Sequence, residues 1–200
     1  MTARGRFLVF EGIDGCGKST QARRVAAARG ALLAFEPGDT AAGRALRAVV
    51  LDDQVPMTPL AEALVMAADR AQHVAEVVGP ALVAGRDVVC DRYDGSTLAY
   101  QGYGRGLELS ALRGVLQVAT GGLVADLTVL LDCPVELAAA RRGRADGDRF
   151  EGAAGGFLDR VREGFLKLAA TSPNWVVLDA AVDVEALSAA VDAAIASVVP

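Results

Sequence analysis

The chain has 200 residues, of which 52% are hydrophobic and 22% are charged, a composition typical of one compact α/β domain with a substantial core. Its 20 basic and 25 acidic residues give a net charge of -5, which argues against nucleic acid or an anionic membrane surface as a partner. Charges interrupt every apolar stretch well short of a membrane span, and Met1–Arg6 is too short and polar for a signal peptide.

Short apolar runs alternate with stretches of helical periodicity along the whole chain. The predicted strands cover residues 7–10, 31–35, 88–90, 127–131 and 176–178. The predicted helices cover residues 20–29, 42–51, 59–83, 107–118, a segment starting near Pro134, 157–170 and 184–198. This alternation predicts βαβ units, and we expect a single α/β domain over residues 1–200 with a five-stranded parallel sheet and helices on both faces.

The first predicted strand leads directly into a glycine-rich loop with the spacing of a phosphate-binding P-loop. Its residues are Gly12, Ile13, Asp14, Gly15, Cys16, Gly17, Lys18 and Ser19. Glycines let backbone N–H groups wrap around a phosphate, and the start of the following helix adds partial positive charge. Lys18 would reach the terminal phosphates, and the Ser19 hydroxyl would bind Mg²⁺. The strand before the loop and the helix after it favour this interpretation over a turn that only caps a helix.

An acidic residue follows each predicted strand. These residues are Glu11, Glu36, Asp91, Asp132 and Asp179. Because the carboxyl ends of parallel strands share one edge of a sheet, we expect Glu36 and Asp91 to lie near the P-loop, where a ligand binds. Asp132 is predicted to cap the helix near Pro134, and Asp179 is assigned a structural role.

The predicted helix over residues 59–83 has one apolar face and a second, more polar stripe. The stripe consists of Glu62, Met66, Arg70 and His73. Spacing alone favours a solvated face for these residues. His73 is the only histidine of the chain, and its position gives no separate indication of a catalytic base or a metal ligand.

Two later segments have the composition of ligand-binding loops. Residues 96–106 combine hydroxyl, amide and tyrosine side chains with three glycines, which favours a loop that binds a heterocycle or sugar over an irregular connection. Residues 141–149 carry four arginines, which suits a lid at about 141–151 that closes over transferring phosphates; a solvated charged turn is the alternative. The tail 184–198 is interpreted as packing only.

Several short motifs, taken together and in this order, resemble thymidylate kinases along nearly the whole chain. They are Phe10-Glu11-Gly12 with the P-loop, Glu36-Pro37-Gly38, Ala68-Asp69-Arg70-Ala71-Gln72, Asp91-Arg92-Tyr93, Ala99-Tyr100-Gln101-Gly102 and the arginine-rich lid. The resemblance implies a P-loop nucleoside-monophosphate-kinase fold, often homodimeric, that transfers the γ-phosphate of ATP to dTMP, giving dTDP, with Mg²⁺.

The resemblance also implies roles on the donor side of the site. Beside the P-loop residues, the expected ATP-binding residues are Thr20, Arg142 and Arg149. Ser19 and Asp91 would hold Mg²⁺. The residues expected to act in catalysis are Asp14, Lys18, Arg92 and Arg144.

On the acceptor side, the resemblance makes Arg70 the residue that hydrogen-bonds the thymine, which reverses the solvated interpretation of its stripe. Arg92 would clamp the acceptor phosphate. Thr97 and Tyr100 would contact the base and the sugar, with the tyrosine crowding a ribose 2′-hydroxyl. The full set of expected substrate-binding residues is Phe35, Glu36, Met66, Arg70, Arg92, Thr97, Tyr100 and Gln101.

The chain departs from the family pattern at three positions. Met66 stands where an aromatic residue usually stacks on thymine, and a thioether offers a ring less contact area. Phe35 replaces the arginine of the bacterial Arg-Glu-Pro pattern. Gly15 stands where some relatives carry a catalytic arginine, so we expect the lid to supply that charge, through Arg144 with support from Arg142 or Arg149.

A phosphate monoester is already ionised near neutral pH, so its transfer needs alignment and charge stabilisation but no general base. Two alternatives stay open: a kinase for another nucleotide or nucleoside, and a nucleotide-dependent switch of the GTPase type. The chain lacks the Asn-Lys-x-Asp motif that reads guanine, which argues against the switch.

The chain has three cysteines without metal-like spacing, Cys16, Cys90 and Cys133. Their number and spacing predict a reducing cytoplasm.

Overall fold

A five-stranded parallel sheet lies at the centre of the computed structural model, which describes residues 4–142 and 156–198. The strands are β1 (Phe7–Glu11), β2 (Leu32–Phe35), β3 (Val88–Asp91), β4 (Leu127–Asp132) and β5 (Trp175–Asp179). Their order across the sheet is β2-β3-β1-β4-β5, and all neighbouring pairs are parallel. The predicted sheet is therefore confirmed, with strand ends that differ from the prediction by one residue.

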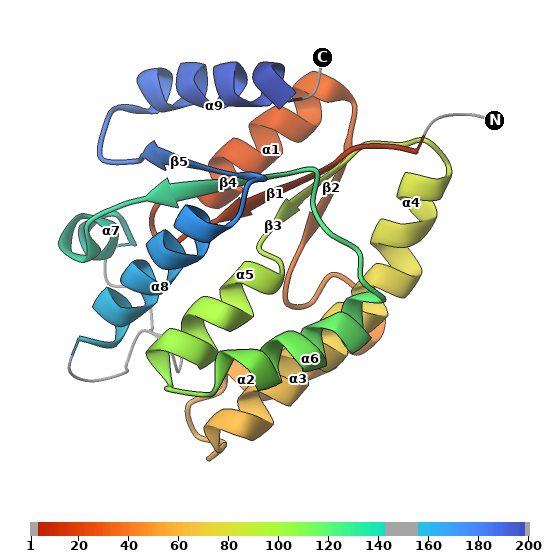
Figure 1. Cartoon of the computed structure of the whole chain (residues 1–200), viewed down its shortest axis with the longest axis vertical. Coiled ribbons are helices and arrows are strands. Elements are labelled where there is room, and N and C mark those ends of the chain that lie inside the picture. Colours follow the sequence, from red (N-terminus) through yellow and green to blue (C-terminus); the bar gives the residue numbers. More distant parts are fainter. Residues whose placement is uncertain (1–3, 143–155, 199–200) are drawn as a thin grey trace.

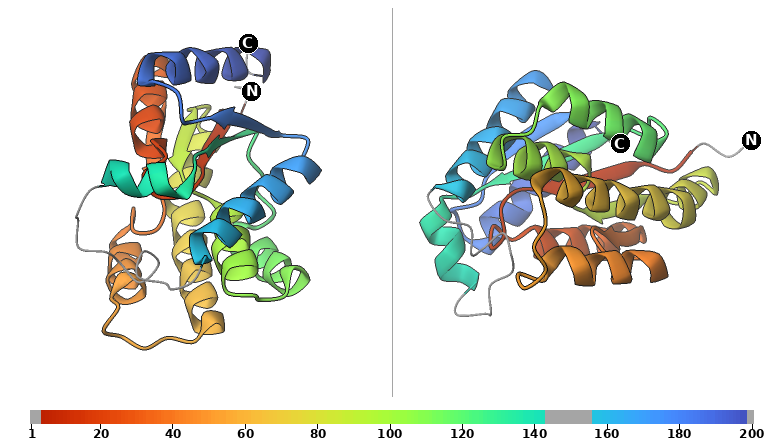
Figure 2. Two further views of the ribbon diagram at one scale, coloured as in Figure 1. Left: turned by 90° about the vertical axis from the view of Figure 1, so that its left-hand side faces the viewer. Right: turned by 90° about the horizontal axis from the view of Figure 1, so that it is seen from below.

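Helical segments connect the strands and cover the sheet on both sides. Within the described residues they are α1 (Lys18–Arg29), α2 (Ala41–Leu51), α3 (Pro59–His73), η1 (Val74–Val78), α4 (Gly79–Val83), α5 (Asp94–Thr97), η2 (Leu98–Gly104), α6 (Leu109–Thr120), α7 (Val135–Arg142), α8 (Phe157–Thr171) and α9 (Val184–Val198). The π-helical turns η1 and η2 continue α3 into α4 and extend α5. In Figures 1 and 2, α1 and α9 lie on one side of the sheet, while α3, α5, α6 and α8 lie on the other.

Alternate residues of the central strand β1 enter two separate hydrophobic clusters. Leu8 and Phe10 belong to the larger cluster, and Phe7 and Val9 belong to the smaller one. All four side chains are fully buried. Because both faces of a parallel sheet are covered by helices, its strands appear in the sequence as continuous apolar runs without polar alternation.

Threonines fix the starts of the neighbouring helices α2 and α3. Thr40 accepts a hydrogen bond from the Gly43 N–H at the start of α2. Thr58 does the same for Ala61 in α3, where Pro59 occupies the first turn. Such caps satisfy backbone donors that a helix start leaves without partners. The two helices pack against each other, as Figure 1 shows.

The expectation of a loop at residues 96–106 is wrong, because most of this segment is helical in α5 and η2. Glycines in this segment and in α8 allow η2 and α8 to pack closely against each other. A Cβ at Gly104 would lie 2.6 Å from the Phe157 ring, and a Cβ at Gly164 in α8 would lie 2.7 Å from Tyr103 Cβ. The glycine content that suggested a loop thus reflects a tight contact between η2 and α8.

The predicted cap at Asp132 is also wrong. Asp132 is the last residue of β4, and Pro134 directly precedes α7. The Asp132 carboxylate instead accepts hydrogen bonds from Arg162 Nε and Nη2 at 2.7 and 2.8 Å. It therefore joins β4 to α8. Within the described ranges, no helix is long and apolar enough to cross a membrane.

Candidate active site

The P-loop leaves β1 at the carboxyl edge of the sheet and leads into α1. Gly12, Gly15 and Gly17 have φ angles of 140°, 88° and 99°, which other residues rarely adopt. No side chain among the described residues caps the start of α1, so its first N–H groups are available to an anion. Lys18 is 4% exposed, and its Nζ donates to the Ile13 carbonyl at 2.9 Å. The lysine side chain is thus held against the P-loop.

A cavity opens beside the P-loop, and its far wall comes from the end of the chain. Of the expected ATP-binding residues, those from Asp14 to Thr20 line it, whereas Gly12, Ile13 and Arg142 do not. Val182, Val184 and Leu187 add an apolar wall suited to a nucleobase. Two residues at the start of α9, Val184 and Leu187, thus line a cavity although their segment is interpreted from the sequence as packing only.

Helix α7 lies over the P-loop and closes the space at Gly15. A Cβ at Gly15 would lie 2.2 Å from the Ala138 carbonyl oxygen. Arg142, the last residue of α7, donates from Nη1 to the Asp14 carbonyl at 3.2 Å. An arginine side chain at position 15 is incompatible with this placement of α7. The two other arginines expected in the lid, Arg144 and Arg149, lie outside the described residues.

Ser19 and Asp91 meet where α1 begins and β3 ends. The Ser19 hydroxyl donates to Asp91 Oδ2 at 2.5 Å. Asp91 Oδ1 is buried and has no hydrogen-bond partner among the described residues, a costly state unless a cation or water binds it. Hydroxyl and carboxylate oxygens suit Mg²⁺, which also takes phosphate oxygens and water. The pair fits the expected magnesium site. No group of three or more metal-ligating side chains occurs within residues 4–142 and 156–198.

Arg92 joins the P-loop to the helical segment after β3. It is the only residue other than glycine with a positive φ in the described part of the chain, at 74°. Such a backbone costs of order 1–3 kcal/mol and is kept where surrounding contacts demand it. Its guanidinium donates to Asp14 Oδ1 at 2.7 Å, to Ser96 Oγ at 2.9 Å and to the Gly12 carbonyl at 3.1 Å. The guanidinium carbon lies 5.1 Å from the centre of the Tyr100 ring.

Asp14 is the carboxylate at the centre of this arrangement. Burial alone would raise the pKa of Asp14, but the charges of Arg92 and Lys18 outweigh burial and hold that pKa well below its usual range. Burial raises the pKa of Tyr100, so its phenol stays protonated and can donate to Asp14 Oδ2, which lies 3.2 Å away. Asp14 therefore stays ionised and fixes two neighbouring side chains.

Arg70 is 2% exposed and lies on α3 facing the loop after β2. Its Nε donates to Glu36 Oε2 at 2.8 Å, Nη1 to Thr97 Oγ1 at 2.9 Å and Nη2 to the Tyr93 carbonyl at 2.7 Å. A guanidinium has five N–H donors, so two are left without a partner among the described residues. Burying such donors without a partner is costly, so they are suited to bind an acceptor atom of a ligand.

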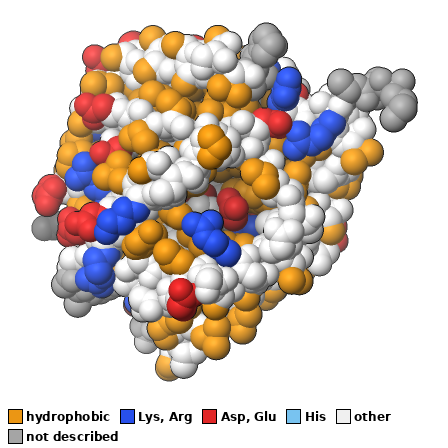
Figure 3. Space-filling model, viewed as in Figure 1, with side chains coloured by type: hydrophobic (Ala, Val, Ile, Leu, Met, Phe, Trp, Pro, Cys, Tyr) orange, Lys and Arg blue, Asp and Glu red, His pale blue; other side chains and the backbone are white. Residues whose placement is uncertain are grey.

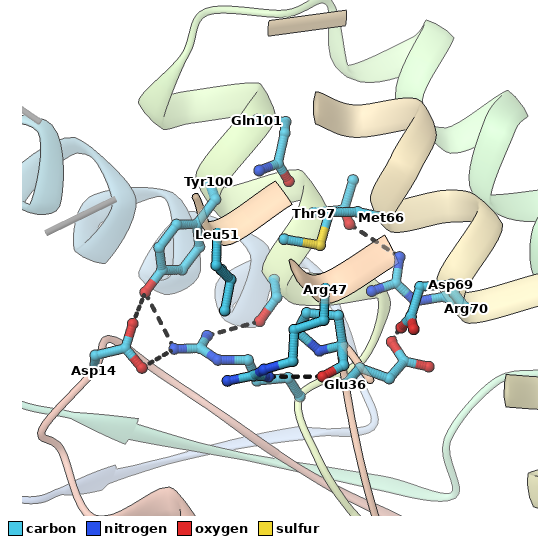
Figure 4. A pocket seen from close by; sticks show the side chains of 13 residues that line it. Asp14, Glu36, Arg47, Leu51, Met66, Asp69, Arg70, Thr97, Tyr100 and Gln101 are labelled. Carbon is cyan, nitrogen blue, oxygen red and sulfur yellow. Dashed lines mark hydrogen bonds and ion pairs between the residues drawn. The ribbon is translucent and has the colours of Figure 1, made fainter. Parts of the chain in front are cut away.

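Most of the expected substrate-binding residues line one cavity, shown in Figure 4. The expected substrate-binding residues in its lining are Glu36, Met66, Arg70, Arg92, Thr97, Tyr100 and Gln101, and Asp14, expected on the donor side, lines it too. Phe35 is not among them: it is 41% exposed and lines a neighbouring cavity with Lys18 and Asp91. Gln101 is held by Glu62, whose Oε1 accepts from its Nε2 at 2.9 Å. Glu62, Arg70 and His73 are all buried, so the solvated interpretation of their stripe is wrong.

The same cavity is also lined by residues outside the predicted site. They are Pro37, Arg47, Leu51, Asp69 and Ser96. Arg47 on α2 donates to the Pro37 carbonyl at 2.7 Å, and Asp69 Oδ1 accepts from the Gly38 N–H at 3.0 Å. Asp69 directly precedes Arg70 in a motif already noted, a signal that could have identified it. Nothing comparable distinguishes Arg47 from the other exposed arginines of the chain.

Glu11, at the end of β1, holds the turn that carries Arg92. Its Oε1 accepts from the Tyr93 and Ser96 N–H groups at 3.0 and 2.9 Å, and Oε2 accepts from the Ser96 hydroxyl at 2.6 Å. Burial raises the pKa of Glu11 to about 7, although the Arg92 charge and the hydrogen bonds oppose this rise. The carboxyl thus positions the segment between the two cavities and stays out of solvent.

Comparison with known proteins identifies the family. The thymidylate kinase family profile matches residues 10–191. A thymidylate kinase of Prochlorococcus marinus (strain MIT 9313) is 50% identical over 94% of this chain and 92% of its own length. One from Carboxydothermus hydrogenoformans is 46% identical, with 83% and 85% covered. The crystal structure of thymidylate kinase from Ehrlichia chaffeensis superposes with a TM-score of 0.79 at 28% identity, covering 96% of this chain and 99% of that one. This chain belongs to the thymidylate kinase family.

Proposed function

We propose that the cleft between the P-loop and α3 is where this chain carries out the reaction of its family, transfer of the γ-phosphate of ATP to dTMP. The observation that carries the proposal is the pair of adjoining cavities. One is built on the P-loop and the other is lined by the buried Arg70, and Asp14 lines both. A donor phosphate in the first cavity would face an acceptor phosphate in the second at that carboxylate.

On the donor side, the backbone amides of the P-loop and the start of α1 bind the phosphates of ATP. Lys18 places a compact ammonium beside the terminal phosphates. The apolar wall of Val182, Val184 and Leu187 receives the nucleobase. The acceptor is held by two arginines with different tasks.

Arg92 clamps the acceptor phosphate, and its bonds to Asp14 and Ser96 fix the plane of its guanidinium. Arg70 directs its two remaining N–H donors at the thymine, beside Thr97. Met66 packs against the base, and Tyr100 borders the sugar. Phe35, an expected substrate contact, lies in the lining of the neighbouring cavity.

The phosphoryl group moves by alignment and charge stabilisation, without a general base. Gly15 has no room for a side chain, so the positive charge that compensates the transition state comes from the lid. We assign this role to Arg144, with Arg142 and Arg149 in support. Mg²⁺ held by Ser19 and Asp91 would neutralise charge on the phosphate oxygens when bound.

We further propose that the chain acts as a homodimer. Four large hydrophobic side chains are exposed on neighbouring helices: Val49 on α2, Leu60 and Leu64 on α3, and Val118 on α6. Hydrophobic side chains gather at the lower end of the molecule in Figure 3, where Figure 1 places these helices. Exposed apolar patches of this kind mark interaction surfaces. Light scattering should give twice the chain mass, and Leu64→Glu should return it to the monomer.

We also place the enzyme in the cytoplasm. The three cysteines are buried and unpaired, which suits a reducing compartment.

The test of the proposed reaction is direct detection of product. The protein is incubated with γ-labelled ATP, dTMP and Mg²⁺, and labelled dTDP is separated and counted. We expect labelled dTDP that disappears when EDTA is added. Release of labelled phosphate from GTP without acceptor phosphorylation would overturn the proposal in favour of a nucleotide switch.

A further inference from the structure

His73 forms part of a buried cluster of charges behind the acceptor cavity. It ends α3, its side chain has no exposure, and it faces the turn between β2 and α2. The charged groups around it are Glu36 and Asp39 from that turn and Asp69 and Arg70 from its own helix. Three carboxyl groups therefore lie around the imidazole, and one of them, Glu36, also binds the Arg70 guanidinium.

The two ring nitrogens of His73 each face a carboxylate oxygen. Nδ1 lies 2.8 Å from Glu36 Oε1, and Nε2 lies 3.2 Å from Asp39 Oδ2. Nε2 has no hydrogen-bond partner among the described residues in this arrangement. A neutral ring protonated at Nδ1 could still donate to Glu36 but would leave Nε2 beside Asp39 with no proton to donate. The imidazolium carries an N–H on both nitrogens and a positive charge between the two carboxylates.

Glu36 contacts both His73 and Arg70, the residue proposed to face the nucleobase. Its Oε1 is 2.8 Å from His73 Nδ1, and its Oε2 accepts from Arg70 Nε at 2.8 Å. Glu36 and Arg70 are 5% and 2% exposed, so water does not compete for either bond. The orientation of the Arg70 guanidinium thus depends on a carboxylate that His73 holds from the other side.

We propose that His73 is a positioning residue for the acceptor nucleotide: as an imidazolium it fixes Glu36, and Glu36 fixes the guanidinium of Arg70 at the base. The inference rests on the proposed function, since it takes Arg70 as the contact to the base. Burial would lower the pKa of His73, but the hydrogen bond to Glu36 and the charges of Glu36, Asp39 and Asp69 outweigh burial and raise that pKa from its usual range.

The sign of the pH effect follows from this arrangement. Binding of dTMP requires the oriented Arg70, and the protonated His73 maintains that orientation, so protonation and binding favour each other. The affinity for dTMP is therefore highest below the pKa of His73 and falls as the pH rises through it. The affinity for ATP, which is proposed to bind on the other side of Asp14, should not depend on the protonation of His73.

Two amide substitutions separate the contributions of the ring nitrogens. In His73→Asn the amide nitrogen takes the place of Nδ1 and can still donate to Glu36, whereas in His73→Gln it takes the place of Nε2, facing Asp39. We expect His73→Gln to raise KM for dTMP about tenfold and His73→Asn only about threefold, because only His73→Gln loses the charge-assisted hydrogen bond to Glu36. KM for ATP should change less than twofold. An unchanged KM for dTMP in His73→Gln would overturn the proposal.

A second measurement uses the wild-type protein and does not depend on variants that fold. Because the chain has one histidine, nitrogen-15 NMR of the untagged protein reports the imidazole of His73 alone. We expect both ring nitrogens to be protonated at pH 7, with a pKa that rises when dTMP binds. A neutral ring at pH 7 in the dTMP complex would contradict the proposal. Failure to phosphorylate dTMP in the product assay would instead overturn the proposed function.

Discussion

The two halves of the cleft are built by different means. The phosphate-binding part of the proposed donor half is one contiguous stretch, Gly12–Ser19, in which three glycines with positive φ present backbone amides and one lysine lies against its own loop. The acceptor half combines side chains from the turn after β2, from α2 and α3, and from the segment after β3. Backbone geometry specifies the first half, and buried charge-assisted hydrogen bonds specify the second. Substitutions in one half should therefore change the binding of one substrate, ATP or dTMP, without changing the binding of the other.

The largest effect should come from the lysine of the donor half. Lys18→Ala removes the ammonium beside the transferring phosphate, and we expect kcat to fall about 10³-fold, as when a preorganised electrostatic donor is lost from an active site. The matched control is Lys167→Ala, the only other lysine, which is exposed and paired with Glu163. Steady-state kinetics measure both variants. A fall of less than tenfold for Lys18→Ala would show that another group carries the donor charge.

Arg144→Ala tests whether the lid completes the donor half. We expect kcat to fall about 10²-fold with less than a threefold change in the Kd of dTMP, because the contact forms chiefly in the transition state. Arg86→Ala, at an exposed arginine outside both cavities, serves as the control. Rapid-quench kinetics and calorimetry give the two quantities. An unchanged kcat would assign the role to Arg142 or Arg149.

Arg92→Lys tests the acceptor half with the charge preserved. Lysine cannot reproduce a planar fork that reaches Asp14, Ser96 and Gly12 together. We expect KM for dTMP to rise about tenfold, the equivalent of roughly 1.4 kcal/mol, while KM for ATP changes less than twofold. If the two KM values rose together, the separation into halves would be contradicted.

Met66→Phe should have the smallest effect and the opposite sign. Met66 lines the acceptor cavity next to Arg70 and Thr97, where a flat ring offers more contact with a base than a thioether does. We expect KM for dTMP to fall about threefold, in line with roughly 0.5–1.5 kcal/mol for an aromatic pair. Met57→Phe, outside this cavity, is the control. No gain at position 66 would mean that the base is held elsewhere.

The same difference explains what could be predicted from the sequence. The P-loop is local, so its spacing after a strand identified it without a structure. The strands were equally accessible, because burial on both faces leaves continuous apolar runs such as Phe7–Phe10. The end of a predicted strand pointed to Glu36, the family resemblance added Arg70, Thr97 and Tyr100, and the structure brings all four to one cavity. The role of each residue in binding remains a prediction.

Long-range contacts set the limits of prediction. The stripe of Glu62, Arg70 and His73 has the spacing of a solvated face, but partners such as Glu36 and Gln101, distant in sequence, bury it. Helical packing against α8 could not be inferred from the glycines of residues 96–106. Val184 and Leu187 looked like ordinary core because nothing in their own segment indicates that they face the P-loop.

The measurement that tests the central claim most directly is kcat/KM for a panel of acceptors with ATP and Mg²⁺. The panel contains dTMP, dUMP, dCMP and dGMP. With Arg70 facing the base and Met66 beside it, we predict the highest value for dTMP and at least about tenfold lower values for dCMP and dGMP, whose edges present a different pattern of donors and acceptors. Equal or higher turnover of any acceptor other than dTMP would contradict the account.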